Sequence, residues 1–152
     1  DLAESEWDRV MDVNLKTCFL AMKYVIPIME RQGGGSIVNV GSMSGFIVNK
    51  PQPQSYYNAS KAGVHHLTKS LAVEWAKRGV RVNAVAPTYT QTPLLAGLEE
   101  SKDMVDRWLD LTPMGRLGRP DEIASVVLFL ASDASSLMTG SIVTADAGYT
   151  AI

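Results

Sequence analysis

Two short runs rich in β-branched residues, with a long helical pattern between them, constrain the fold of this chain most. The first run covers residues 36–41, and the second covers residues 80–86, where Pro87 stops it. Apolar residues recur at helical spacing over residues 55–78, so strand, helix and strand follow one another. Such a βαβ unit makes its two strands parallel neighbours. Ser42 would then lie at the carboxyl end of the first strand, where open α/β sheets bind ligands.

A phenol and an ammonium group lie four residues apart near the start of the predicted helix, in Tyr57-Asn58-Ala59-Ser60-Lys61. Residues four apart share one helix face, so Tyr57 and Lys61 should be neighbours. A free tyrosine has a pKa of roughly 10 and exchanges protons poorly at neutral pH. A positive charge nearby favours the phenolate, and acid/base catalysis needs a pKa close to the working pH. The pair is therefore a candidate proton-transfer site, although a short motif is weak evidence by itself.

Six further motifs accompany this pair along almost the whole chain. They are Val13-Asn14-Leu15, Val40-Gly41-Ser42, Val82-Asn83-Ala84-Val85-Ala86-Pro87, Pro113-Met114-Gly115-Arg116-Leu117-Gly118-Arg119-Pro120, Thr139-Gly140 and Asp146-Ala147-Gly148. In this order and at these spacings, they resemble the short-chain dehydrogenase/reductase family. The resemblance implies an α/β fold with a Rossmann-type doubly wound parallel sheet, and an oxidoreductase that uses NAD or NADP.

The resemblance also implies roles for four residues. Tyr57 would be the general acid/base that exchanges a proton with the substrate oxygen, and Ser42 would hydrogen-bond the same oxygen. Lys61 would favour the phenolate and hydrogen-bond the nicotinamide ribose. Asn14 would complete a catalytic tetrad by holding a water near Lys61 for proton relay.

Further cofactor contacts are implied in the segment that follows the second strand. Besides Tyr57 and Lys61, the residues expected there are Pro87, Thr88, Thr90 and Thr92. The family usually has glycine where this chain has Thr88, which removes the freedom for a positive φ and puts the local backbone in question. Substrate contacts are expected from Ser42, Ser44, Asn49 and Tyr57.

The sequence contains no glycine-rich phosphate loop of the dinucleotide-binding type. Folds of that type carry G-x-G-x-x-G or a relative in their first βα turn, whereas Gly33-Gly34-Gly35 precedes a strand here. The first element is a helical pattern over residues 5–31, which Pro27 should bend or shorten. We therefore expect residues 1–152 to form the C-terminal catalytic part of a single Rossmann-fold domain, with the first βα units absent.

The remaining pattern predicts three elements. A long segment at residues 88–119 contains an amphipathic stretch at 104–111, and a helix at 120–131 and a short strand at 142–145 follow. Pro120 suits the first turn of that helix. Proline has no backbone N–H to donate, and the N–H groups of a first turn have no acceptor within the helix.

Composition argues against several classes of function. A net charge of −2 gives no basic surface for nucleic acid. No apolar run is long enough to span a membrane. The single Cys18 excludes an internal disulfide and suits a cytoplasmic protein. His65 and His66 are adjacent, so they point in different directions on a helix, and with no Cys or carboxylate at metal-ligand spacing we expect no metal site.

The loop at residues 46–54 bears on the substrate. It contains three amide side chains, and each hydroxyl of a desolvated polyol needs a polar partner. The segment 41–49 also looks like that of polyol dehydrogenases and ketose reductases, which favours a sugar alcohol or ketose. A 3-oxoacyl thioester or another carbonyl compound stays open, as does a truncated, catalytically inactive chain. By resemblance, the two long helices would pair with their copies, so we expect a homotetramer with a small-molecule substrate.

Overall fold

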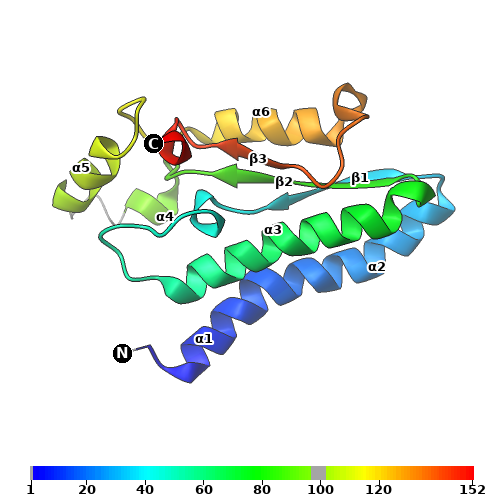
Figure 1. Cartoon of the computed structure of the whole chain (residues 1–152), viewed down its shortest axis with the longest axis horizontal. Coiled ribbons are helices and arrows are strands. Elements are labelled where there is room, and N and C mark those ends of the chain that lie inside the picture. Colours follow the sequence, from blue (N-terminus) through cyan, green and yellow to red (C-terminus); the bar gives the residue numbers. More distant parts are fainter. Residues whose placement is uncertain (1, 97–101) are drawn as a thin grey trace.

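A three-stranded parallel sheet forms the middle layer of the computed structural model, which describes residues 2–96 and 102–152. The strands lie in the order β1 (Gly35–Val40), β2 (Val80–Pro87) and β3 (Ile142–Ala145). Helix α6 (Pro120–Ala131) covers one face of the sheet, and helices α2 (Thr17–Arg31) and α3 (Ser55–Trp75) cover the other (Figure 1). The predicted α/β class with a doubly wound parallel sheet is confirmed.

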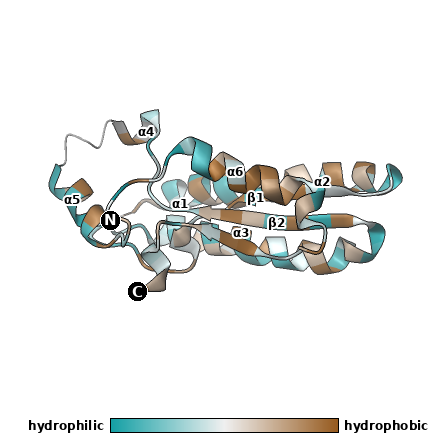
Figure 2. Cartoon of the chain, turned by 90° about the horizontal axis from the view of Figure 1, so that it is seen from above, coloured by the Kyte–Doolittle hydropathy of each residue, from teal (hydrophilic) through white to brown (hydrophobic). Residues whose placement is uncertain are grey.

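Strand β2 is the centre of the sheet and is buried on both faces. Val40 of β1 is in register with Val85, and Ala84 of β2 is in register with Ile142 of β3. Parallel strands between two helical layers have no solvated face, which explains why five of the seven residues at 80–86 are apolar. The hydropathy colouring shows the mainly apolar strand β2 between the helices (Figure 2).

The main core lies between the sheet and the pair α2 and α3. Met22 and Ile26 of α2 and Ala72 of α3 pack there against Val80 and Val82 of β2. Partly buried side chains surround this cluster, namely Cys18, Met29, Ile37, Leu67, Leu71 and Trp75. The packing holds α3 against the strands. It thereby fixes the position of the first turns of α3 relative to the end of β1.

The helix predicted over residues 5–31 is divided in the structure. Helix α1 (Glu4–Met11) and α2 are joined by a π-helical turn over Asp12–Lys16, and the axis continues past Pro27 to Arg31. Pro27 therefore does not end the helix. It stands in the last turns, where the loss of one backbone donor affects few following hydrogen bonds.

The carboxyl ends of the strands face a group of short elements. A 3₁₀ turn over Met43–Gly45 follows β1, α4 (Pro93–Ala96) and α5 (Lys102–Asp110) follow β2, and a 3₁₀ turn over Tyr149–Ala151 follows β3 (Figure 1). Residues 97–101 of the predicted irregular segment lie outside the described residues. Within the described part of the chain, no helix combines the length and apolar character that a membrane crossing needs.

Candidate active site

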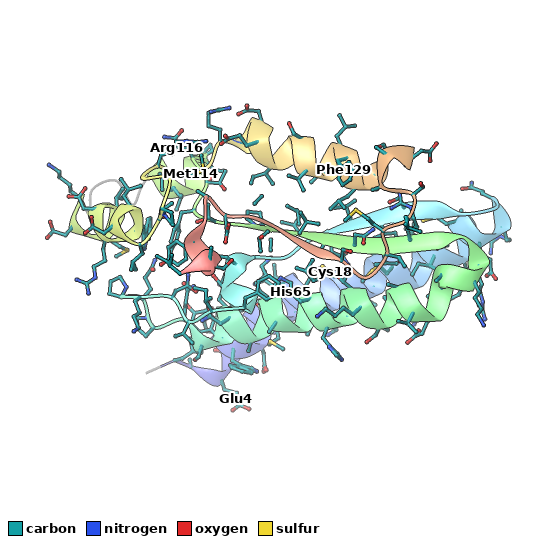
Figure 3. All side chains as sticks on the ribbon, turned by 45° about the horizontal axis from the view of Figure 1, so that its top comes forward. Glu4, Cys18, His65, Met114, Arg116 and Phe129 are labelled. Carbon is teal, nitrogen blue, oxygen red and sulfur yellow. The ribbon has the colours of Figure 1, made fainter. Side chains whose placement is uncertain are left out.

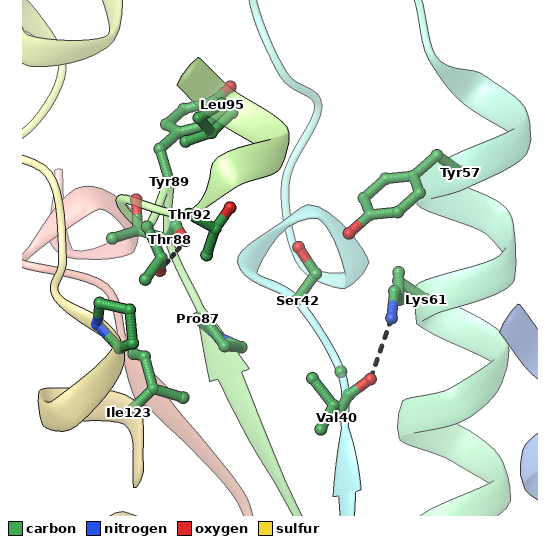
Figure 4. A pocket seen from close by; sticks show the side chains of 13 residues that line it. Val40, Ser42, Tyr57, Lys61, Pro87, Thr88, Tyr89, Thr92, Leu95 and Ile123 are labelled. Carbon is green, nitrogen blue, oxygen red and sulfur yellow. Dashed lines mark hydrogen bonds between the residues drawn. The ribbon is translucent and has the colours of Figure 1, made fainter. Parts of the chain in front are cut away.

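A pocket of about 490 Å³ opens at the carboxyl ends of β1 and β2. Figure 4 shows its walls, which come from the end of β1, the start of α3, the segment after β2 and the start of α6. The residues that line it are Val40, Gly41, Ser42, Tyr57, Lys61, Pro87, Thr88, Tyr89, Thr90, Thr92, Leu95, Pro120 and Ile123. The structure thus brings Ser42, Tyr57 and Lys61 together with all four cofactor-binding candidates at and after the end of β2.

Ser42 is the extended residue that precedes the 3₁₀ turn. Its Oγ accepts a hydrogen bond of 3.1 Å from the backbone N–H of Ser44. One step earlier, the Gly41 N–H donates to the Val85 carbonyl at 2.8 Å, which ties the segment to β2. Because the Ser44 amide already uses Oγ as an acceptor, the hydroxyl proton of Ser42 is left to be donated toward the pocket.

Tyr57 and Lys61 lie on adjacent turns of α3 that face the end of β1, and the Tyr57 hydroxyl points into the pocket near that of Ser42 (Figure 4). The Lys61 Nζ donates to the Val40 carbonyl at 2.9 Å and lies 5.7 Å from the centre of the Tyr57 ring. Burial lowers the pKa of Lys61 from its ordinary value. The predicted neighbourhood of phenol and ammonium is therefore present.

Asn14 lies in the π-helical turn, outside the lining of the pocket. Its Nδ2 donates to Ser60 Oγ at 3.0 Å, and that hydroxyl donates to the Tyr57 carbonyl at 2.7 Å. A π-helical turn displaces carbonyls from the regular ladder, and the Asn14 carbonyl accepts from the Cys18 thiol at 3.3 Å. Asn14 thus contacts the backbone that carries Tyr57 through one intervening side chain.

Thr88 stands where the family usually has glycine, and the local backbone does not need a positive φ there. Among the non-glycine residues of the described ranges, only Ala147 has a positive φ, of 55°. The Thr88 N–H donates to the Ala145 carbonyl at 3.2 Å, and its own carbonyl accepts from Thr90 Oγ1 at 2.9 Å. The Thr88 hydroxyl itself is buried without a partner in the described part of the chain.

The other two substrate-binding candidates, Ser44 and Asn49, do not line the pocket. Both are buried, and Asn49 is only 3% exposed. Asn49 Nδ2 donates to the Tyr89 hydroxyl at 3.0 Å, so its amide is used inside the protein. Their contact with a substrate stays a prediction, and it would require this packing to change.

Tyr89 is a pocket residue that the sequence reasoning missed. Its ring stacks on Trp108 of α5 with ring centres 4.0 Å apart, and its hydroxyl donates to Gln52 Oε1 at 3.1 Å. Trp108 Nε1 donates to the same oxygen at 3.0 Å. The only sequence signal was an aromatic residue within the predicted cofactor segment, between Thr88 and Thr90, since spacing cannot show that α5 folds back onto it.

Metal-binding side chains do not gather in this region. In residues 2–96 and 102–152, no three His, Cys, Asp or Glu side chains lie close enough together to hold an ion.

Comparison with known proteins identifies the family of this chain. A family model described as enoyl-(acyl carrier protein) reductase matches residues 1–150. Galactitol 2-dehydrogenase of Rhizobium johnstonii is 56% identical over 150 residues, which is 99% of this chain and 58% of that protein. The chain belongs to the short-chain dehydrogenase/reductase family. A galactitol 2-dehydrogenase (L-tagatose-forming) of Cereibacter sphaeroides is 52% identical over 97% of this chain and 58% of its own length.

Family members with other substrates are similar as well. The 3-oxoacyl-[acyl-carrier-protein] reductase of Thermotoga maritima is 46% identical over 97% of this chain and 58% of its own length. The crystal structure of gox2181 superposes with a TM-score of 0.98 at 55% identity, over 100% of this chain and 59% of that one. An Agrobacterium tumefaciens structure described as a putative 2-deoxy-d-gluconate 3-dehydrogenase with bound NADP has a TM-score of 0.93 at 37% identity, over 100% of this chain and 61% of that one. The chain therefore spans about 60% of the length of these relatives.

Proposed function

We propose that the whole protein is an NAD- or NADP-dependent oxidoreductase that interconverts a secondary alcohol and a ketone, with a sugar alcohol or ketose as substrate. The observation that carries the reaction type is the convergence of Ser42, Tyr57 and Lys61 on one pocket. The substrate class is supported by the two galactitol dehydrogenases, which match 99% and 97% of this chain.

The proton would move through Tyr57. In the direction of alcohol oxidation, the substrate hydroxyl gives its proton to the Tyr57 oxygen, and in the direction of ketone reduction Tyr57 returns it. Lys61 places a positive charge 5.7 Å from the centre of the Tyr57 ring, which favours the phenolate form of Tyr57 after it has lost its proton. The Ser42 hydroxyl donates a hydrogen bond to the same substrate oxygen and stabilises the negative charge that develops there.

Asn14 acts on this site through the backbone. The chain of hydrogen bonds from Asn14 to Ser60 and on to the Tyr57 carbonyl fixes the turn of α3 that carries the phenol. The predicted role of Asn14 in holding a water near Lys61 is compatible with its position in the π-helical turn, and we retain it as part of this proposal.

The residues after β2 fit a nicotinamide group. The unpartnered Thr88 hydroxyl, together with the hydroxyls of Thr90 and Thr92, offers donors and acceptors to a carboxamide beside the apolar side chains of Pro87 and Ile123. Such a cofactor would take the hydride from the alcohol carbon or give it to the ketone. The structure with bound NADP is a relative, so the choice between NAD and NADP stays open in the proposal.

Residues 1–152 would then be the C-terminal catalytic part of one Rossmann-type domain, since the chain spans about 58% of its curated relatives. The whole protein would be a homotetramer. Exposed apolar side chains on α2 support this assembly, among them Phe19, Tyr24 and Ile28. Static light scattering of the whole protein should give about four subunit masses, and a monomer at micromolar concentration would contradict the assembly. The cytoplasmic location expected from Cys18 stays a prediction.

A substrate panel tests the function. The purified whole protein is assayed with NAD⁺ and with NADP⁺ on galactitol, arabinitol and sorbitol, and with NADH and NADPH on the corresponding ketoses and on acetoacetyl thioesters. Turnover of a polyol or ketose at a kcat/KM well above that of the thioester would support the proposal. The reverse order would favour the 3-oxoacyl alternative. The absence of cofactor binding in a fluorescence titration with NADH and NADPH would favour the inactive alternative.

A further inference from the structure

The side chain of His65 fills the space next to the segment at residues 41–46, which carries Ser42. His65 follows Lys61 by one helical turn on α3 and is 5% exposed, between that helix and the strands (Figure 3). A Cβ atom on Gly41 would lie 2.4 Å from His65 Nε2, and one on Gly45 would lie 2.5 Å from His65 Cε1. The Phe46 ring lies against the imidazole with ring centres 4.4 Å apart. The segment therefore closes around this ring, and two glycines make the approach possible.

The imidazole also holds the backbone of Ser42. The Ser42 N–H donates to His65 Nε2 at 3.4 Å, which assigns the proton of a neutral ring to Nδ1, a buried nitrogen without a partner among the described residues. Burial, with the nearby charges of Lys61 and Lys69, lowers the pKa of His65 to about 4. The ring is therefore neutral at physiological pH and remains an acceptor for the Ser42 amide.

The other attachments of this segment run to β2, to Val40 or within the turn itself, where the Gly45 N–H donates to the Ser42 carbonyl at 3.0 Å. Gly41 is tied to β2 through Val85, and the Val40 carbonyl is tied to α3 through Lys61. The Ser44 N–H bonds Ser42 Oγ, which orients the hydroxyl within the segment and does not link it to α3. His65 thus provides the contact between α3 and the backbone of Ser42. The same helix carries Tyr57, so the distance between the two reacting hydroxyls depends on this contact.

We propose that His65 is a positioning residue that acts through Ser42. It holds the Ser42 hydroxyl at the distance from the Tyr57 hydroxyl that the reaction needs. The inference rests on the proposed function, because it assigns His65 to the alcohol–ketone reaction of the same pocket. A misplaced reacting group can lower the rate by about 10²-fold, and loss of one donor to a developing oxyanion lowers it by about 10²–10³-fold. Loss of the His65 contact displaces Ser42 without removing it, so we expect a decrease of roughly 10–100-fold in kcat.

Two substitutions separate the hydrogen bond from the packing. His65→Leu fills similar space without an acceptor, whereas His65→Gln can present its amide oxygen near the position of Nε2. In the whole protein, with its best alcohol substrate, His65→Leu should lower kcat by roughly 10–100-fold with little change in KM, and His65→Gln should recover most of the loss. The matched control is His66→Leu, since His66 is exposed, points about 100° away from His65 around the helix axis, and should leave kcat unchanged.

A double-mutant cycle with Ser42→Ala shows whether His65 acts through Ser42. If it does, His65→Leu should change kcat by less than about threefold in the Ser42→Ala background. An equal decrease in both backgrounds, an equal decrease for His65→Leu and His65→Gln, or a His65→Leu enzyme with the parent kcat would each overturn the proposal. Thermal unfolding of every variant identifies any that fails to fold.

A measurement on the unsubstituted protein complements the kinetics. Imidazole ¹⁵N spectra at neutral pH should show His65 with its proton on Nδ1 and an unprotonated Nε2. A proton on Nε2 would overturn the proposal whatever the variants do. Failure of the proposed function is distinguishable, because the parent would then turn over no alcohol or ketone on the panel, while the tautomer would still report on the contact with Ser42.

Discussion

Removal of the Tyr89 hydroxyl tests the polar cluster behind the pocket. This hydroxyl accepts from Asn49 Nδ2 at 3.0 Å and donates to Gln52 Oε1 at 3.1 Å. Burial is the main cause that raises the pKa of Tyr89 to about 12, so the group stays neutral and keeps both bonds at physiological pH. Tyr89→Phe leaves the Asn49 amide without an acceptor in a side chain that is 3% exposed. Gln52 Oε1 still accepts from Trp108 at 3.0 Å.

The expected loss of stability follows from the difference between the Asn49 donor, which loses its acceptor, and the Gln52 oxygen, which keeps one donor. A buried donor without a partner costs about 1–3 kcal/mol, whereas the oxygen of Gln52 keeps one of its two donors. We therefore expect Tyr89→Phe to lower the free energy of unfolding by about 2 kcal/mol. Asn49 Oδ1 is already buried without a partner among the described residues, so Asn49→Leu should cost less than Tyr89→Phe.

Urea unfolding of the whole protein measures these changes. Leu137→Ala is the control, because Leu137 is 99% exposed and lies outside the two long helices that are proposed to form the subunit contacts. The double variant Tyr89→Phe/Asn49→Leu should be less destabilised than the sum of its single variants, since replacing both partners removes the orphaned donor. A loss below about 0.5 kcal/mol for Tyr89→Phe, which is the range of an ordinary surface substitution, would refute the reasoning.

Three further predictions concern other parts of the site. Tyr57→Phe should lower turnover by about 10²–10⁴-fold in steady-state assays of the whole protein, and turnover within about threefold of the parent would exclude Tyr57 as the general acid/base. The lowered pKa of His65 predicts full stability above the unfolded-state value of 6.5 and a progressive loss as the pH falls toward about 4, because the unfolded state then binds a proton that the folded state refuses. This loss amounts to about 3 kcal/mol at most, and His65→Gln should remove it from urea unfolding series at pH 4–7, so equal slopes for parent and variant would count against a buried neutral imidazole. Trp108→Ala should cost about 3–5 kcal/mol in the same assay because Trp108 is 1% exposed, whereas Trp7→Ala, at a side chain that is 39% exposed, should cost clearly less.

The order of elements and the face of α3 that carries Tyr57 and Lys61 could be predicted because both depend on local periodicity. A run of β-branched residues buried on both faces reads as a strand, and the spacing of Tyr57 and Lys61 puts both on one side of α3. The start of the helix at Pro120 could also be predicted, because proline and acidic residues are both favourable in the first turn of a helix.

The contacts that shape the pocket could not be predicted in the same way. Tyr89 and Trp108 come from segments nineteen residues apart, and no local pattern brings their rings together. His65 was recognised only as one of two adjacent histidines, because burial against Gly41 and Gly45 depends on how the turn after β1 folds. The amides of Asn49 and Gln52 were expected to face a substrate, whereas the structure gives them aromatic partners inside the protein.

The π-helical turn at Asp12–Lys16 changes the rotational phase of the helix that contains it. Val10 and Met22 are both buried, and they are twelve residues apart. At 3.6 residues per turn, this separation would place them about 120° apart around a regular helix axis. A turn that accommodates one extra residue reduces the offset to about 20°, so both side chains can face the protein interior. Deleting one residue within the turn would leave Val10 and Met22 eleven residues apart on a regular helix and keep the offset at about 20°, whereas winding the unshortened chain as a regular α-helix would turn one of the two side chains toward solvent.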